Sequence, residues 1–273
     1  MALQKYLQPK VEVPPNLGEL HDRYRTAAPF PHIALDNLFS PSFLDRVLAE
    51  ASQLKADQWI NVEQDHLEKT LRMRSAVEVG DAGAELIALL HSAAFLYLLS
   101  EITGIWQLLP DPYLQGAGHA SMHRGDYFKV HADRNIAYDT GLTRRLAMII
   151  FLNKDWPADY GGRLELWNPE GTRCETAIEP VFNRTAIFEV AYPNYHGVPE
   201  PLTCPPDRTR HSFLVYYHTA GGGAGDKVKP HTSRFAPQFY RKQKSLLRRT
   251  LDQITPPIIV SAVSAARKLV RGR

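Results

Sequence analysis

The residues best suited to metal chemistry lie in the stretch FKVHADRN, residues 128–135. His131 and Asp133 are two positions apart, and residues two apart in a β-strand project from the same face of the sheet. An imidazole and a carboxylate on one face form either an ordinary surface hydrogen bond or two ligands of a metal ion. A lone H-x-D pattern does not decide between these alternatives, so the metal interpretation requires a third ligand elsewhere in the chain.

His196, in the stretch YPNYHGV, is the candidate third ligand. Two imidazoles and one carboxylate can occupy one triangular face of an octahedral ion and leave three sites open, the arrangement expected of a non-haem Fe(II) oxygenase. Tetrahedral structural zinc would favour cysteines, and neither Cys174 nor Cys204 has a ligand-like spacing. Taken alone, His196 fits equally well as a turn histidine bonded to the backbone.

Arg210 immediately precedes the apolar run HSFLVYY and is the candidate anion-binding residue. An arginine that enters an apolar strand is costly unless it meets an anion, and its planar fork matches a carboxylate. The alternative is an ion pair with one of the 29 acidic residues of the chain. Arg208 has the same strand parity, so spacing alone leaves both arginines as candidates.

The elements that must position these residues change type after Gly116. Before it, Ser40 and Pro41 are suited to begin a helix that runs to about Leu54, and a second helix is predicted over about 84–101. After it come short β-type runs between turn signals. Seven such runs are predicted strands: 119–123, 126–133, 146–152, 163–167, 174–179, 185–190 and 211–217. Strands in series with helices segregated at the front predict an α+β fold, a jelly roll with the N-terminal helices packed on one sheet.

Composition separates a basic tail from the rest of the chain. Residues 226–273 contain 12 Lys and Arg against two Asp, whereas the preceding 225 residues carry a net charge of −7. We therefore expect a domain over 1–225, with its jelly-roll core at about 117–219, and a basic, helical extension over 226–273. The sequence of this extension predicts two helices, separated at Pro256–Pro257. Such a tail is suited to a peripheral membrane contact or to binding an anionic partner. Packing of the tail onto the barrel or onto a second copy of the chain explains its composition equally well.

Other sequence features narrow the class of protein. The start of the chain lacks the apolar run of a signal peptide, and two cysteines are too few for a disulfide framework, so the cytoplasm is the expected location. No GxGxxG or P-loop pattern supports a dinucleotide or nucleotide site. No RNP, KH or helix-turn-helix signature indicates nucleic acid as a partner. The sequence does not indicate an oligomeric state.

Over residues 117–219 the chain resembles the 2-oxoglutarate/Fe(II)-dependent dioxygenases, specifically their prolyl-hydroxylase-like branch. Six segments carry the resemblance, in this order: RGDYFKVHAD, IFLNKDW, YGGRLELW, IEPVFNRTAIF, YHGVP and RHSFLVYY. The opening PFPHIALDNLFS is similar to the family's approach to its first helix. Residues 55–85 and the tail have no match in the pattern.

The resemblance implies a double-stranded β-helix whose mouth holds Fe(II), with His131, Asp133 and His196 as the iron ligands. It also implies that Arg210 grips the distal carboxylate of the co-substrate 2-oxoglutarate, which is converted with O2 to succinate and CO2. One position departs from the animal oxygen-sensing enzymes: Phe151 stands where they have a tyrosine whose hydroxyl also binds that carboxylate. The retained Asp133 favours hydroxylation over halogenation, because related halogenases replace this carboxylate with a small residue.

The resulting hypothesis is a hydroxylase that acts on an unactivated C–H bond of a peptidyl, proline-like side chain or of a small molecule or glycan. The alternatives are a non-catalytic jelly-roll binding module and an adaptor that acts through the basic tail. Residues near the H-x-D pattern and at the end of the fourth predicted strand are candidates for substrate contact. These are Tyr127, Arg134, Asn135 and Trp167.

Overall fold

The computed structural model describes residues 2–64, 66–73, 79–111, 113–137, 140–221 and 230–239. The chain divides into two compact units, Met1–Phe239 and Tyr240–Arg273, and every described residue belongs to the first. The two tail helices predicted around Pro256–Pro257 lie outside the described residues. Residues 230–239 follow the domain boundary predicted at residue 225, yet they pack within the first unit.

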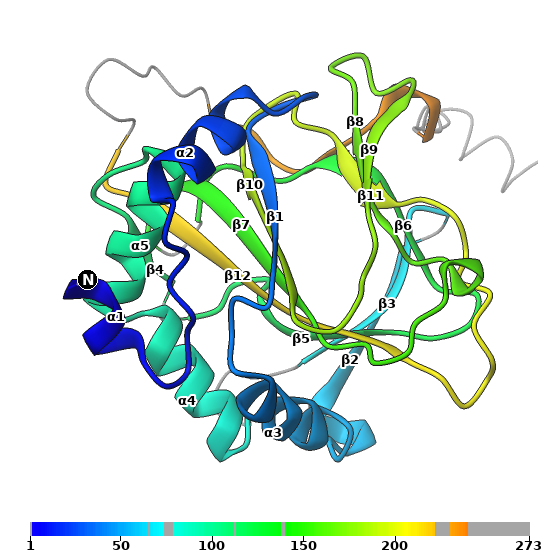
Figure 1. The fold of residues 1–273 in the computed structure, drawn as a ribbon. Helices are drawn as coiled ribbons and strands as arrows, with labels where there is room; N and C mark the ends of the chain where they lie inside the picture. Colours follow the sequence, from blue (N-terminus) through cyan, green and yellow to red (C-terminus); the bar gives the residue numbers. More distant parts are fainter. Residues whose placement is uncertain are drawn as a thin grey trace, which may run out of the picture. The chain divides into compact units, whose positions relative to one another are not determined.

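The described strands form one antiparallel sheet that curls into a nearly closed barrel (Figure 1). Hydrogen-bonded neighbours follow the order β1-β10-β7-β12-β5-β3-β6-β11-β8-β9. In addition, β2 pairs with β3, β4 with β12, and β13 with β6. This arrangement confirms the predicted jelly-roll core. The strands are β1 (His32–Asp36), β2 (Trp59–Gln64), β3 (Glu68–Met73), β4 (Leu109–Pro110), β5 (Gly118–Met122), β6 (Tyr127–Ala132), β7 (Thr143–Phe151), β8 (Leu164–Trp167), β9 (Cys174–Ile178), β10 (Arg184–Glu189), β11 (His196–Val198), β12 (Arg210–Thr219) and β13 (Arg234–Phe235).

All seven predicted strands are present, as β5 to β10 and β12. The strands that the sequence did not predict are β1 to β4, β11 and β13. Three of these, β4, β11 and β13, have only two or three residues, which is too short for an alternating pattern to be recognised. Strand β2 has no buried residue and four of the six residues of β3 are polar, so this hairpin lacks the pattern of a half-buried strand.

Five α-helices are described: α1 (Ala2–Leu7), α2 (Leu17–Thr26), α3 (Pro41–Ala51), α4 (Asp81–Leu90) and α5 (Ala93–Thr103). The helix beginning at Pro41 is confirmed, but the single helix predicted over 84–101 is wrong. It is two helices, α4 and α5, that meet at an angle of 55°. Ser92 starts the second one, since its hydroxyl accepts a hydrogen bond from the Phe95 amide at 3.2 Å. Among the described helices, none alone has the length and composition to cross a membrane; α4 and α5 pass that test only together, as a bent pair.

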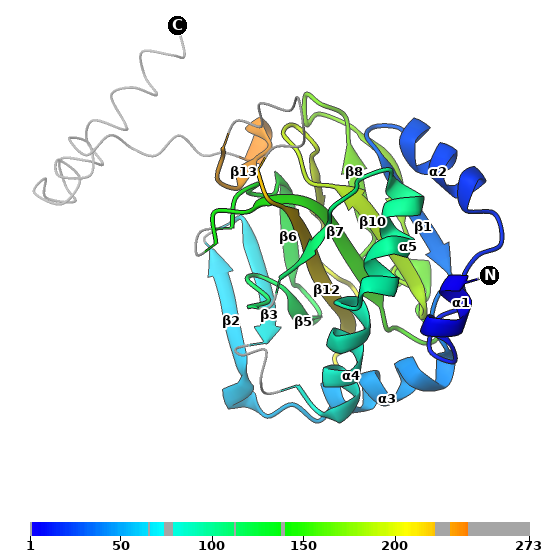
Figure 2. The same ribbon diagram turned by 90° about the vertical axis from the view of Figure 1, so that its left-hand side faces the viewer.

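The helices cover the outer face of the layer formed by β10, β7 and β12 (Figure 2). Alternation along β12 divides its side chains between two cores. Phe213, Val215 and Tyr217 pack against the helices, whereas Leu214 and Tyr216 point into the barrel with Phe188 of β10. Because Arg210 has the parity of Leu214 and Tyr216, the fold turns its side chain into the barrel.

Candidate metal centre

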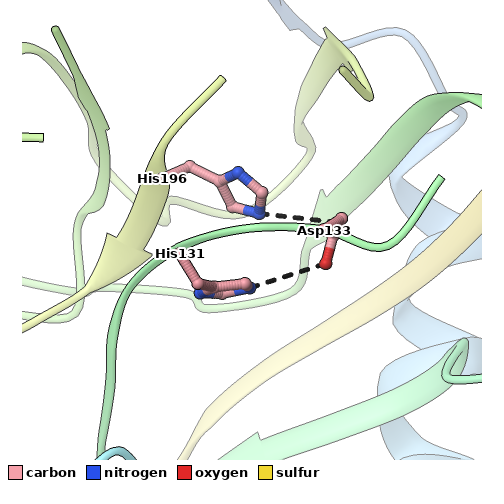
Figure 3. Close-up of side chains that lie close together, drawn as sticks. All are labelled: His131, Asp133 and His196. Atoms are coloured by element: carbon pink, nitrogen blue, oxygen red, sulfur yellow. Dashed lines mark ion pairs between the residues drawn. The ribbon is translucent and has the colours of Figure 1, made fainter. Parts of the chain in front are cut away.

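Pairing between β6 and β11 brings the three predicted ligands together. His196, the first residue of β11, lies opposite His131 of β6 in the antiparallel register, so the two imidazoles project from one face. Asp133 follows the last residue of β6, and its carboxylate faces both imidazoles (Figure 3). One ligand atom from each side chain can be chosen such that all lie within 4.8 Å of one another, and all three residues are buried.

Backbone carbonyl groups orient both imidazoles. The Nδ1 atom of His131 lies 2.8 Å from the carbonyl oxygen of Lys129, and that of His196 lies 3.2 Å from the carbonyl oxygen of Asn194. A carbonyl oxygen only accepts, so each Nδ1 carries the proton and each Nε2 presents its lone pair. The two Nε2 atoms each lie 3.5 Å from an oxygen of Asp133. Neutral imidazoles held in this tautomer are the form that binds a metal ion.

The Asp133 carboxylate is anionic in this environment. Burial by itself raises the pKa of Asp133, but in the metal-free site hydrogen bonds from His131 and His196 protonated on Nε2, together with their charges, outweigh burial, so its pKa lies well below the usual range. A metal ion bound at the Nε2 lone pairs takes the place of those protons. The hydroxyl of Tyr216 donates a further hydrogen bond to Oδ2 at 3.1 Å. Two nitrogen donors and one hard oxygen donor, in a cluster that includes no cysteine among the described residues, fit Fe(II) in the facial arrangement of two histidines and a carboxylate.

Arg210 enters the same cavity as the three ligands. It is 4% exposed, and burial lowers the pKa of its guanidinium to about 10, which leaves it charged at neutral pH. Its Nε donates to the carbonyl oxygen of Gly162 at 2.8 Å and Nη1 approaches the sulfur of Met122, a weak acceptor, at 3.6 Å. Among the described residues no carboxylate pairs with Arg210, so the cavity contains an uncompensated cation suited to an anionic ligand.

Arg208, the other arginine of the same parity, is directed elsewhere. Its Nη2 donates to the carbonyl oxygens of Lys154 and Asp155 at 2.7 and 2.9 Å, and its guanidinium lies near the rings of Trp156 and Tyr160. It lines a separate open groove on the outside of the barrel. The structure therefore distinguishes Arg210, which enters the cavity, from Arg208, which does not; sequence spacing alone could not distinguish them.

Ser212 and Tyr216 line the cavity, and the sequence did not indicate either. Both have the strand parity of Arg210, and this signal could have identified them. Ser212 lies opposite Phe151 across the β12–β7 pair, and Phe151 packs its buried ring 5.1 Å from the Arg210 guanidinium. The serine hydroxyl is thus adjacent to the position where the family's tyrosine is replaced. Thr70 and Arg72 of β3 also line the cavity.

The four residues predicted to contact substrate do not line this cavity. Arg134 lines a different groove, which also contacts His131. The ring centroid of Tyr127 lies 5.0 Å from Nζ of Lys129. Asn135 is buried and accepts a hydrogen bond from the His231 amide at 2.8 Å, a structural contact. Trp167 donates its indole N–H to Glu165 at 3.0 Å. A role of these four residues in substrate binding stays a prediction.

Comparison with known proteins identifies the same segment. Residues 117–218 match the model of the 2OG-Fe(II) oxygenase superfamily. Egl nine homolog 1 of Rattus norvegicus is 34% identical over 96 residues, which are 35% of this chain and 27% of that protein. The chain thus accounts for only about a quarter of that relative's length.

Two solved structures share the fold. A prolyl hydroxylase from Trichoplax adhaerens, solved with a peptide of the oxygen degradation domain of hypoxia inducible factor, has a TM-score of 0.55 and 20% identity over 74% of this chain and 88% of that one. A prolyl-4-hydroxylase from Pseudomonas putida has a TM-score of 0.53 and 17% identity over 76% of this chain and 100% of that one. The matched segment contains the ligand cluster and Arg210. Residues 117–218 of this chain are therefore similar to the 2OG-Fe(II) oxygenase superfamily, and the two solved structures that share the fold are prolyl hydroxylases.

Proposed function

We propose that this protein is a 2-oxoglutarate-dependent dioxygenase that hydroxylates an unactivated C–H bond. The observation that carries the proposal is the presence, in one buried cavity, of the His131–Asp133–His196 cluster and of the unpaired cation of Arg210. A metal site needs only the cluster, whereas a non-catalytic jelly-roll module needs neither. A co-substrate that is both a chelator and a dianion explains why the cavity has both features.

The three ligands and Arg210 have distinct tasks. His131 and His196 present their Nε2 lone pairs, held by the backbone carbonyls behind them, and Asp133 supplies the anionic ligand. Fe(II) held by these three side chains would supply the oxidant, through oxidative decarboxylation of 2-oxoglutarate with O2. Arg210 binds the distal carboxylate and so fixes which end of the co-substrate faces the cluster.

Apolar side chains exclude water from the space between Arg210 and the cluster. Leu164, Phe188, Leu214 and Ile149 line the cavity that contains Arg210 and the cluster. An apolar lining that excludes water strengthens the attraction between the guanidinium and a carboxylate. It also limits side reactions of the oxidant with water. The Ser212 hydroxyl is the polar group that we assign to the distal carboxylate in place of the tyrosine hydroxyl that is lost at Phe151.

For the substrate we propose a peptidyl, proline-like side chain or a small molecule or glycan that reaches the open side of the cluster. The prolyl hydroxylases similar in sequence and fold support the peptidyl class. This part of the proposal is tested by incubating the active protein with candidate pools and searching for a mass gain of one oxygen atom that depends on 2-oxoglutarate.

Anaerobic titration with Fe(II) and 2-oxoglutarate tests the reaction class, because the chelate of the two gives a weak visible charge-transfer band. We expect this band in the wild-type protein and its loss in His131→Ala. Arg210→Met should weaken 2-oxoglutarate binding at saturating Fe(II) by about 100-fold, since a buried charge-assisted pair is lost. Arg208→Met is the matched control, because it removes an arginine of the same strand parity that lies outside the cavity. Absence of the band from the wild-type protein would favour the binding-module alternative.

A further inference from the structure

Tyr216 touches the metal cluster and has no role in the steps above. Its side chain lies in the barrel interior and lines the cavity. Its hydroxyl lies 3.1 Å from Oδ2 of Asp133 and donates to it. The residue itself is 6% exposed, so water does not compete freely for this hydrogen bond. A hydrogen bond from a neutral donor to a buried carboxylate is among the stronger ones that a protein forms.

The position of this hydrogen bond matters because the Asp133 carboxylate has two ways to bind an ion. It can use one oxygen, or it can chelate with both. With two histidines, one-oxygen binding leaves three of six sites open, whereas chelation leaves two. A co-substrate that takes two sites and an O2 that takes one need all three. Oδ1 lies 3.5 Å from Nε2 of His131 and Oδ2 lies 3.5 Å from Nε2 of His196, so both oxygens face the cluster. The Tyr216 hydroxyl occupies a lone pair of Oδ2 alone, which weakens Oδ2 as a ligand and favours binding through Oδ1.

Arg144 of β7 supports Tyr216 from the other side. Its guanidinium lies 3.6 Å from the centroid of the tyrosine ring, a distance at which a cation is attracted to an aromatic face. Arg144 is 2% exposed, and its Nη2 donates to the carbonyl oxygen of Gln115 at 3.0 Å, which fixes the guanidinium in place. A cation stacked on the ring withdraws electron density from the phenol and makes its hydroxyl a better donor.

We propose that Tyr216 is a positioning residue that holds Asp133 as a one-oxygen ligand, and that Arg144 acts on the metal site through Tyr216. The inference rests on the proposed function, because it assigns a role at the same metal site. It goes beyond that function in naming two residues outside the ligand set and the order in which they act: Arg144 on Tyr216, and Tyr216 on Asp133. Tyr216 belongs to β12, and its position in that strand brings its hydroxyl next to the Asp133 carboxylate.

The test is the affinity of the full chain for Mn(II) without co-substrate, followed by electron paramagnetic resonance of the free ion. Tyr216→Phe keeps the ring and its stacking on Arg144 but removes the donor. We expect the affinity to fall about 10- to 100-fold, the range found when the partner of a metal ligand is removed. Tyr217→Phe is the matched control. This neighbouring tyrosine is also buried, but its hydroxyl donates to the carbonyl oxygen of Leu90 at 3.3 Å, on the helical side of the sheet.

A double-mutant comparison tests the order of action. Arg144→Met should lower Mn(II) affinity severalfold in the wild-type background and leave it unchanged in the Tyr216→Phe background, because Arg144 then has no hydroxyl to act through. A melting temperature lowered equally in Tyr216→Phe and Tyr217→Phe, with both affinities within twofold of wild type, would overturn the proposal by reducing Tyr216 to a packing role. Failure of the wild-type protein itself to bind Mn(II) or Fe(II) would instead overturn the proposed function.

Discussion

Arg210 depends on a glycine for its place in the cavity. Gly162 has a φ of +81°, and a Cβ built on it would lie 2.8 Å from Cδ of Arg210. The same glycine offers the carbonyl oxygen that binds Nε of Arg210. A side chain at this position would therefore push the guanidinium away from the anion that it is proposed to bind. The neighbouring Gly161 also has a positive φ, +71°, but its Cβ would meet nothing closer than 4.0 Å.

This pair of glycines allows a residue-scale prediction. Gly161→Ala and Gly162→Ala should each cost about 1–3 kcal/mol of unfolding free energy, because both force alanine into a backbone region that glycine favours. Only Gly162→Ala should also weaken 2-oxoglutarate binding at saturating Fe(II), by about tenfold or more, since it displaces a charged hydrogen-bond donor. Urea unfolding and the visible titration measure the two effects separately. Equal co-substrate affinities in the two variants would show that Arg210 tolerates the displacement.

At the scale of elements, β13 is the strand that changes where the domain ends. Phe235 pairs with His131 in the register, and its ring centroid lies 5.7 Å from that imidazole. The amide of the next residue, Ala236, donates to the carbonyl oxygen of Val130 at 2.8 Å, and Ala236 is fully buried. The strand therefore supports β6 directly beside a metal ligand.

Two truncations separate β13 from the basic tail. A chain ending at residue 239 should keep the Mn(II) affinity of the full chain. A chain ending at residue 225 should lose about 2–4 kcal/mol of unfolding free energy, from lost backbone hydrogen bonds and exposed apolar surface, and should bind Mn(II) at least about tenfold more weakly. Denaturant unfolding and metal titration of the two chains give the comparison. Wild-type metal affinity in the shorter chain would mean that β6 holds His131 without β13.

The sequence predicted the elements that carry strong patterns and missed those that do not. Alternation over β6, β7 and β12 was sufficient to place them, and the H-x-D spacing with the later His196 gave the ligand cluster that the structure assembles. The cross-strand contacts were not predictable in this way. Tyr216 reaches Asp133 across 83 positions in the chain, and whether Arg208 or Arg210 enters the cavity depends on the carbonyl groups of the loop at 154–155. Such pairings depend on register between strands distant in sequence, and one sequence does not contain that information.

At the scale of the whole molecule, buried histidines couple stability to pH. Burial, and secondarily the proximity of His211, lowers the pKa of His119 to about 3. Burial also lowers the pKa of His211 to about 4, with a smaller contribution from His123. His119 is 2% exposed, and its Nδ1 has no hydrogen-bond partner among the described residues. The folded protein therefore keeps these imidazoles neutral at pH values where the unfolded chain protonates them.

The sign of the effect follows from proton uptake. Below the unfolded pKa of about 6.5 the unfolded state binds more protons than the folded state, so the unfolding free energy falls as pH decreases toward about 4. The slope contributed by His119 is at most about 1.4 kcal/mol per pH unit. His119→Gln removes this proton and should flatten the fall in stability between pH 6.5 and pH 4.5, even though the substitution costs stability at pH 7. Urea unfolding at several pH values in this range measures both slopes. Parallel slopes for the wild-type protein and the variant would mean that His119 takes up its proton without unfolding, and that the acid sensitivity of the barrel originates in other groups.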